Sequence, residues 1–436
     1  MSESSSILNR IARNTGLLFS SKAIAGLAGL LYLALAGRTL GPEQLGMLIL
    51  VHSTTIAIRE IASFKSWQAL IKYGAEYVSN QDNARLHSLL RLMVELDAIG
   101  SIAGSLLSAL FFYYFAPLFG FPPDIASLAV LYCLSTLVAL KASPVGVLRL
   151  FGRFVLLARN ALVVPFLRTT GVVVCWAFDA PLGGFIVLWF LADVCSAVVL
   201  MWLGYQETRR QPLARNISWR WEPLSAEAHA KIWPFIWSAN LHGTVGIATT
   251  HLPVLLSGAL LGPGAAAFVK ICQEVSGILG KPAQLLGETV YPEVSRLIPL
   301  NATQTIRSLL VRSVLLGGLA SLILVVIVIS GGQWLLVLLF GQEYRAASGL
   351  LTLLVIAAGI QLTTFIFEPL IYAQGRPDFV FVLRLVTSIA QISGMIVILP
   401  LLGVNGVGLT TILGTLFASL VMGFHAVGAL GARQKI

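Results

Sequence analysis

Apolar runs of about 20 residues recur along the whole chain, each long enough to cross a bilayer as a helix. Only 11% of the 436 residues are charged, whereas soluble globular proteins contain about 25%. A soluble helical core would need polar faces on most helices, and these runs lack them. Strands are excluded because no alternation of period two occurs, and open sheets do not cross membranes. The sequence therefore predicts an all-α integral membrane protein.

Glycine, proline and polar breakers divide the chain into twelve predicted spans. They are 15–36, 46–64, 92–115, 125–142, 155–178, 182–204, 232–260, 265–287, 310–330, 346–372, 379–400 and 404–430. Lys and Arg favour cytoplasmic loops, and the alternate loops on the opposite side contain only Arg38 and Arg345. Both termini are therefore predicted to be cytoplasmic. The same bias accounts for the net charge of +10 without a nucleic-acid-binding face.

The stretch TLGPEQLG at 39–46 returns as LLGPGAA at 260–266. At nearly the same offset, LFG at 118–120 matches LFG at 339–341, and further pairs follow in the same order. Collinear matches in corresponding helices and loops indicate an internal duplication. Because six is even, the two predicted six-helix repeats run parallel, which is a transporter architecture.

The repeat predicts two lobes that share a cavity and expose it alternately to either side of the membrane. The predicted parts are a cytoplasmic segment 1–14, an N-terminal lobe 15–204, a cytoplasmic linker 205–231, a C-terminal lobe 232–430 and a cytoplasmic tail 431–436.

Charged side chains inside the predicted spans are costly in hydrocarbon, and each needs a physical reason. Basic groups outnumber acidic ones there, so a cavity lined by them would stabilise an anion. The candidate substrate-binding residues are Lys22, Arg59, Arg159, Asn240, His251, Lys270, Glu274 and Arg384.

Structural roles are open alternatives for these candidates. Snorkelling toward the headgroups is the alternative for the arginines near span ends, Arg59, Arg159 and Arg384. For Asn240 and His251, the alternative to substrate binding is an interior position in which the protein satisfies their hydrogen bonds. Lys270 and Glu274, four residues apart, form a structural pair in the competing interpretation. Arg168 has a carboxylate such as Asp193 as a candidate partner in the next helix.

Catalytic and metal-binding patterns are absent from the sequence. The four cysteines lie in apolar runs without CxxC spacing, and no triad, di-metal spacing or phosphate-binding glycine loop appears. The largest predicted inner loops, 65–91, 205–231 and 288–309, are too short for a catalytic domain. We therefore predict no enzymatic activity, no cofactor and no metal.

Three stretches resemble a known transporter family. They are RNT followed by AGRTLGPEQLG in the first span, WQALIKY at 67–73, and FVKICQEVSGILGKPAQLLGETVYPEVSRL at 268–297. Together they resemble the polysaccharide transporter (oligosaccharide flippase, Wzx-type) family. This family belongs to the multidrug/oligosaccharidyl-lipid/polysaccharide (MOP) superfamily, and the resemblance covers nearly the whole chain.

The resemblance implies a flippase in the bacterial inner membrane. Its cargo would be an oligosaccharide linked to a lipid such as undecaprenyl pyrophosphate, for O-antigen, capsule or exopolysaccharide assembly. The implied partners are this lipid-linked oligosaccharide, membrane lipids, a glycan polymerase and a chain-length regulator, with no nucleic acid. Lipid-cargo members place basic residues in helices 1, 2 and 8, where this chain has Lys22, Arg59 and Lys270. Lipid II flippases carry two helices beyond the twelve predicted here, which argues against that cargo.

Two other functions compete with this interpretation. A cation-coupled drug exporter of the same superfamily would need membrane-embedded carboxylates, and the first predicted span has none. A glycan polymerase or ligase would need a substantial outer loop with catalytic residues, which the predicted topology lacks.

Overall fold

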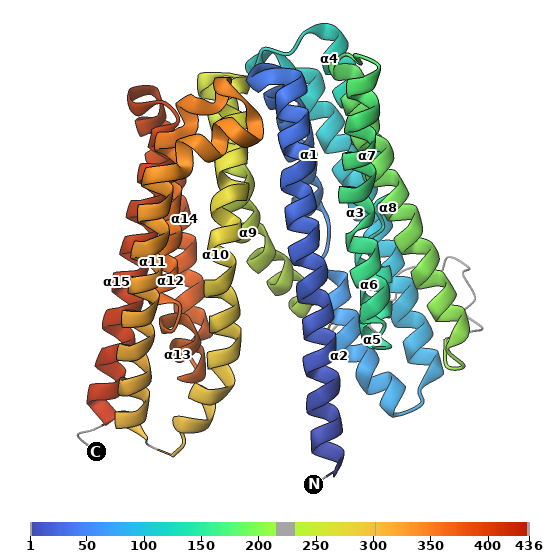
Figure 1. The fold of residues 1–436 in the computed structure, drawn as a ribbon. Coiled ribbons are helices and arrows are strands. Elements are labelled where there is room, and N and C mark those ends of the chain that lie inside the picture. The colour runs from blue at the N-terminus through green and yellow to red at the C-terminus, as the bar shows by residue number, and fades with distance from the viewer. Residues whose placement is uncertain (1, 215–231, 301, 434–436) are drawn as a thin grey trace. The chain divides into compact units, whose positions relative to one another are not determined.

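All regular structure in the described residues, 2–214, 232–300 and 302–433, is helical in the computed structural model (Figure 1). Eight of these helices are long and apolar enough to cross a membrane, or nine with the bent pair Ile232–Ile247 and Thr249–Leu261. The protein is therefore an all-α, multi-pass membrane protein, as predicted.

The N-terminal half begins with α1 (Ser2–Ala62), which is two helices joined at a kink. The other elements of this half are α2 (Ser66–Ser79), α3 (Asn83–Phe115), η1 (Ala116–Phe119), α4 (Pro123–Cys133), η2 (Leu134–Thr136), α5 (Ala142–Leu150), α6 (Phe154–Ala161), α7 (Val163–Ala177) and α8 (Leu182–Arg210).

The C-terminal half repeats this course of helices. Its elements are α9 (Ile232–Leu261), α10 (Pro263–Leu297), α11 (Thr303–Phe340), η3 (Gln342–Ala347), α12 (Ser348–Thr364), α13 (Phe367–Ala373), α14 (Pro377–Leu402) and α15 (Asn405–Arg433).

The sequence predicts twelve spans, whereas eight or nine described helices are long and apolar enough to cross a membrane. The difference has identifiable reasons. The kinked α1 contains the first two spans, and α4 with η2 is a short apolar helix that α5 continues after a break. Lys270, Glu274 and Lys281 make α10 more charged than the other long helices. Counting these segments agrees with a protein of twelve spans in two six-helix halves.

The duplication is visible in the backbone as well as in the sequence. The described glycines with positive φ are Gly41, Gly120, Gly152, Gly262, Gly341, Gly375 and Gly403. Six of them pair across the halves in the predicted alignment, 41 with 262, 120 with 341, and 152 with 375. Gly403 lies in the connection between α14 and α15, and the connection between α7 and α8 in the other half contains Asp179, with a positive φ of 46°. Left-handed backbone favours glycine, so the repeated motifs mark turns that both halves require.

The chain divides into two compact units by its internal contacts. The N-terminal unit contains residues 1–39 and 51–247, and the C-terminal unit contains residues 40–50 and 248–436. The outer turn of α1 and the second part of α9 therefore belong to the C-terminal unit.

Several predicted segment ends differ from the structure. The segment 1–14 is already helical from residue 2, because α1 starts at Ser2. α8 continues to Arg210, six residues into the predicted linker 205–231, of which residues 215–231 lie outside the described part. α15 continues to Arg433 in the predicted tail, whose last residues, 434–436, are also outside it.

The predicted inner loop 65–91 is instead largely helical. It forms α2 and the start of α3, and Ala69 and Leu70 of α2 are fully buried against Leu86 and Leu89 of α3. These apolar residues pack with α5 and α9 in a core cluster of the N-terminal unit. Apolar spacing on one face of α2 carried this signal, but a hydropathy window long enough to detect spans averages it away.

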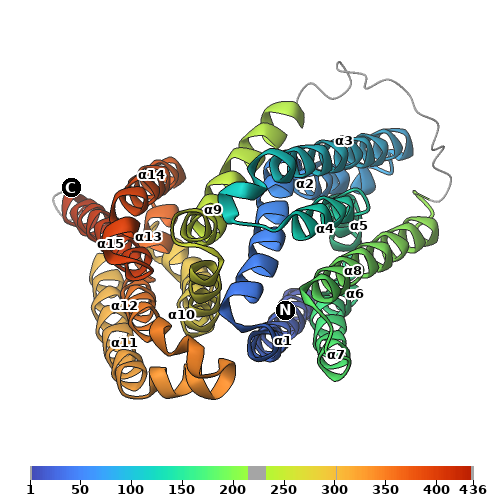
Figure 2. The same ribbon diagram turned by 90° about the horizontal axis from the view of Figure 1, so that it is seen from above.

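In the C-terminal unit, α12 is the central helix. It packs against α10, α11 and α15 (Figure 2). Leu350, Leu351 and Val355 on α12 are at most 1% exposed. By contrast, α11 leaves many large apolar side chains exposed, including Leu315, Leu316 and Leu322. Such a surface is stable in a lipid environment and would be unfavourable in water.

Within the C-terminal unit, the repeated motifs meet. The outer turn of α1 contacts the turn between α9 and α10, so that a Cβ on Gly46 would lie 1.9 Å from the Pro263 carbonyl oxygen. A Cβ on Gly264 would lie 2.8 Å from Glu43 Oε1. The glycines therefore allow a close approach of two backbones, which is the physical reason for this part of the motif.

We predict that Gly46→Ala lowers the thermal unfolding midpoint of the purified protein, because overpacking of a close contact costs about 1–3 kcal/mol. Gly277→Ala is the matched control, because this helical glycine has open space around it and alanine favours helix. Equal midpoints for the two variants would contradict the inferred close contact.

Candidate functional site

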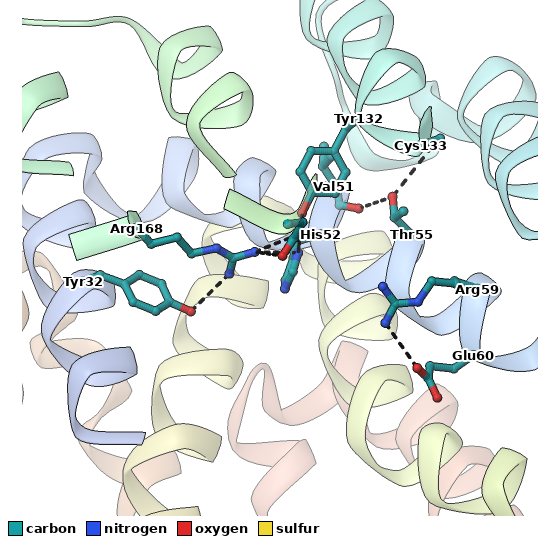
Figure 3. A network of polar contacts seen from close by, with 10 residues as sticks. Tyr32, Val51, His52, Thr55, Arg59, Glu60, Tyr132, Cys133 and Arg168 are labelled. Atoms are coloured by element: carbon teal, nitrogen blue, oxygen red, sulfur yellow. Dashed lines mark hydrogen bonds and ion pairs between the residues drawn. The ribbon is translucent and has the colours of Figure 1, made fainter. Parts of the chain in front are cut away.

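A charged residue, Arg168 of α7, lies at the centre of the N-terminal unit and is only 2% exposed (Figure 3). Its Nη2 atom lies 3.1 Å from both carboxylate oxygens of Asp193 on α8. Its Nη1 donates to the Tyr32 hydroxyl of α1 at 3.3 Å, and its guanidinium centre lies 4.0 Å from the Trp189 ring centroid. The suggested pairing of Arg168 with Asp193 is therefore confirmed.

Asp193 is held by further donors. The Tyr132 hydroxyl of α4 donates to its Oδ2, and His52 Nδ1 of α1 lies 3.7 Å from the same oxygen. His52 Nδ1 is also 2.7 Å from the Tyr132 hydroxyl. Four helices, α1, α4, α7 and α8, thus meet at one ion pair.

This ion pair restricts how the helices can pack more than it adds net stability. Burying two charges costs solvation energy that their attraction repays only with good geometry, whereas removing one partner leaves an uncompensated buried charge. The guanidinium is fixed on several sides by Asp193, Tyr32 and Trp189. The interaction therefore favours one packing of these helices over others.

A second charged cluster lies at the inner end of the second half of α1. Glu60 accepts a hydrogen bond from Arg59 at 3.2 Å and another from Lys65, the residue that precedes α2. These side chains remain partly exposed, at 17% for Arg59, 31% for Glu60 and 18% for Lys65.

Lys141 is near enough to both clusters for their charges to act on it. It precedes α5 in the break after η2. Arg59 and Glu60 of one cluster and Arg168 and Asp193 of the other all act electrostatically on its ammonium. The combined group contains four cations, Arg59, Lys65, Lys141 and Arg168, but only two carboxylates, Asp193 and Glu60.

Asp97 of α3 is a third, buried carboxylate close to this group, and its contacts are structural. Its Oδ1 accepts from the Ser66 hydroxyl at the start of α2. Its Oδ2 accepts from the Ser143 backbone N–H and hydroxyl at the start of α5. Asp97 therefore satisfies a backbone N–H at the N-terminus of α5, where negative charge is favourable, and also binds the side chain of the first residue of α2. Even with Asp97 counted as charged, cations outnumber carboxylates in the group.

The break before α5 has a local cause. The predicted span 125–142 is interrupted because Pro144, in the first turn of α5, has no backbone N–H to bond the carbonyl of residue 140 and its ring would clash with that carbonyl in a continuous helix. Asp97 binds the free Ser143 N–H. Non-helical backbone at membrane depth is tolerated where protein groups satisfy it.

The predicted candidates occupy different parts of the chain. Arg59 is the candidate that joins the charged group. Lys22 lies in α1, and its side chain is not described. Arg159 is exposed on α6, and Asn240 lies in the first part of α9 with its Oδ1 enclosed and without a hydrogen-bond partner.

The remaining candidates belong to the C-terminal unit. Lys270 Nζ lies 2.7 Å from Glu274 Oε1 on α10, so the suggested pair exists. Arg384 donates to both carboxylate oxygens of Glu368 at 2.7 Å. His251 lies in the second part of α9 and is half-buried. Substrate binding by any of these residues stays a prediction.

Sequence reasoning missed the aromatic and histidine partners of the Arg168 pair, Tyr32, His52, Tyr132 and Trp189, and it missed Lys141. Single polar or aromatic residues in apolar helices carry no positional signal about one another. For Lys141, a signal existed, because Pro144 three residues later indicates a broken helix. Among the described residues, no group of three or more His, Cys, Asp or Glu could hold a metal ion.

We predict that Arg168→Met and Asp193→Leu each destabilise the protein by about 3–5 kcal/mol, because each leaves one buried charge unpaired. The double variant should lose less than the sum of the two. The measurement is a double-mutant cycle on thermal unfolding in detergent, with Arg296→Gln as the control, since that side chain is 79% exposed. Additive losses would show that the two residues do not act as a pair.

Comparison with known proteins places the fold and the family. No family model matches the chain. The inner membrane protein YghQ of Escherichia coli (strain K12) is 31% identical over 346 residues, covering 78% of this chain and 95% of that protein.

Two solved structures are similar in fold. An inward-facing multidrug resistance MATE family transporter of the MOP superfamily has a TM-score of 0.76 at 14% identity, over 94% of this chain and 96% of that chain. The lipid II flippase MurJ, in an inward closed conformation, has a TM-score of 0.75 at 12% identity, over 94% and 87%. At these identities the likeness concerns the fold alone. The chain thus has the fold of MATE transporters and MurJ, and it belongs to the family of the inner membrane protein YghQ.

Proposed function

We propose that the protein is a flippase that moves a lipid-linked oligosaccharide across the bacterial inner membrane by alternating access. The cargo carries its sugar on a polyprenyl pyrophosphate and serves surface polysaccharide assembly. The observation that carries this proposal is the excess of cations in the charged group of Arg59, Lys65, Lys141 and Arg168.

The physical argument concerns the cost of charge in the membrane. Placing an uncompensated cation in the hydrocarbon region costs about 2.5–3.5 kcal/mol on insertion scales. A bound anion would remove this cost, and the cations would in turn replace the water lost by the anion. A pyrophosphate diester supplies two negative charges next to an apolar tail, which can stay in the bilayer.

Two comparisons support the proposal without deciding the cargo. MurJ, which has the same fold, is a lipid II flippase. The relative YghQ is an inner membrane protein, which agrees with this location. A glycan polymerase and a chain-length regulator are the partners we propose for a protein that delivers such a cargo.

A cation-coupled exporter is the second candidate, and the MATE-like fold favours it. Such a protein needs a carboxylate that can take up Na⁺ or a proton. In the described part of the N-terminal unit, Asp193 and Glu60 are already bound by Arg168, Arg59 and Lys65, so a cation there would have to displace an internal one. The third carboxylate of this region, Asp97, already accepts hydrogen bonds from Ser66 and Ser143. This arrangement is better suited to an anionic cargo.

We predict that proteoliposomes containing the purified protein move a fluorescent undecaprenyl-pyrophosphate-linked sugar between leaflets, as followed by quenching with a membrane-impermeant reductant. Ethidium accumulation, measured in parallel, should stay at the level of empty liposomes. Ethidium transport without glycolipid movement would replace the proposal with the exporter function.

Charge-neutral variants test the cationic residues named from the sequence. Lys22→Gln and Lys270→Gln should each slow glycolipid movement about tenfold, the effect of losing ~1.4 kcal/mol of a charge-assisted hydrogen bond. Arg296→Gln is the control with an exposed charge. Unchanged rates in both lysine variants, with normal insertion, would remove these two residues from the site.

A further inference from the structure

Lys141 differs from the other cations of the charged group because no described residue pairs with it. Arg168 pairs with Asp193, and both Arg59 and Lys65 pair with Glu60. Among the described residues, Lys141 Nζ has no hydrogen bond and no ion pair within 4 Å. The two nearby carboxylates are therefore already occupied by other cations.

The ammonium of Lys141 is also accessible. The residue is partly buried and deep among protein atoms. Its Nζ atom is nevertheless not fully enclosed by protein atoms. Arg168 Nε, by contrast, is enclosed and has no hydrogen-bond partner. A cation that is not fully enclosed and has no partner among the described residues can accept an anion without first breaking an internal ion pair.

The surrounding structure presents Lys141 to such an anion. The residue precedes α5, whose N-terminal end carries a partial positive charge. Asp97 anchors this helix start through the Ser143 N–H and hydroxyl, and the same carboxylate holds Ser66 at the start of α2. The Lys141 backbone is therefore fixed by its neighbours, while its side chain has no partner in the described part of the chain.

We propose that Lys141 binds the pyrophosphate of the transported lipid, with Arg59 as the second cationic contact. This inference rests on the proposed function and deepens it by assigning the anion to the N-terminal unit. Arg59 is the neighbour suited to share the ligand, because it is 17% exposed and bound to Glu60 through a single hydrogen bond. Arg168 is enclosed and committed to Asp193, so it positions helices and does not contact the ligand.

The experiment measures binding of farnesyl pyrophosphate, a short polyprenyl pyrophosphate, to the full-length protein in detergent by calorimetry. Lys141→Met keeps the side-chain length and removes the charge, and Lys141→Arg keeps the charge. We expect Lys141→Met to weaken binding about tenfold or more, where tenfold equals ~1.4 kcal/mol, and Lys141→Arg to stay near the wild type. Lys72→Met is the matched control, since the Lys72 ammonium lies 4.4 Å from the centroid of the Phe235 ring.

Competing ligands identify the chemistry that is recognised. Inorganic pyrophosphate should displace farnesyl pyrophosphate, and farnesol should bind equally weakly to all variants. Phosphatidylglycerol that competes as well as farnesyl pyrophosphate would overturn the assignment to pyrophosphate, because any anionic headgroup would then suffice. Binding that is unchanged in Lys141→Met would overturn the role of Lys141.

A labelling experiment on the wild type keeps the proposal testable if Lys141→Met does not fold. Farnesyl pyrophosphate should protect Lys141, but not Lys72, from acetylation by a membrane-permeant reagent, as mapped by mass spectrometry. Equal labelling with and without the ligand would contradict the proposal.

Failure of the site and failure of the function give different results. Glycolipid movement by both wild type and Lys141→Met at the same rate would exclude Lys141 and leave the flippase function standing. Binding that depends on Lys141, without any glycolipid movement, would retain the anion site and reject the flippase function.

Discussion

The ion pair between Arg168 and Asp193 organises the N-terminal unit. Because no water is available in the bilayer interior, a buried guanidinium must obtain all its partners from the protein. Asp193, Tyr32 and Trp189 bind its terminal nitrogens and face, while Nε stays enclosed without a hydrogen bond, and Tyr132 and His52 in turn contact Asp193. Four helices are thereby kept in one mutual arrangement. The neighbouring cations, which lack this degree of compensation, are then available for binding.

Enclosed ion pairs and charges without a close partner among the described residues have different roles in the N-terminal unit. Enclosed pairs with several hydrogen bonds favour a unique packing, and mutation of one partner leaves a buried charge. Lys141 occupies a break in a membrane helix and has no counterion among the described residues. Half-helix N-termini and broken helices are recurrent places for anionic groups in transporters. In this chain, Asp97 stabilises such a break by accepting hydrogen bonds from the Ser143 N–H and hydroxyl at the start of α5.

The duplication explains why both halves have turns of the same kind. Matching glycines at positive φ appear where the aligned motifs predict them, and Asp179 has a positive φ in the turn between α7 and α8. In the C-terminal unit, the motif around Gly46 has a further role, since its backbone approaches Pro263 too closely for a side chain. The glycine-proline motif therefore reflects both turn geometry and helix contact.

The sequence by itself determined the fold class, the repeat and the general positions of the spans, because apolar length and turn chemistry are local properties. It also suggested Arg168 with Asp193 and Lys270 with Glu274, since embedded charges require partners. Only the tertiary structure decided which side chains meet across helices. Tyr32, His52 and Tyr132 are separated widely in sequence, and no periodic pattern connects them. That Lys141 has no ion pair with a described carboxylate is likewise decided in three dimensions, because Asp193 and Glu60 are bound by other cations.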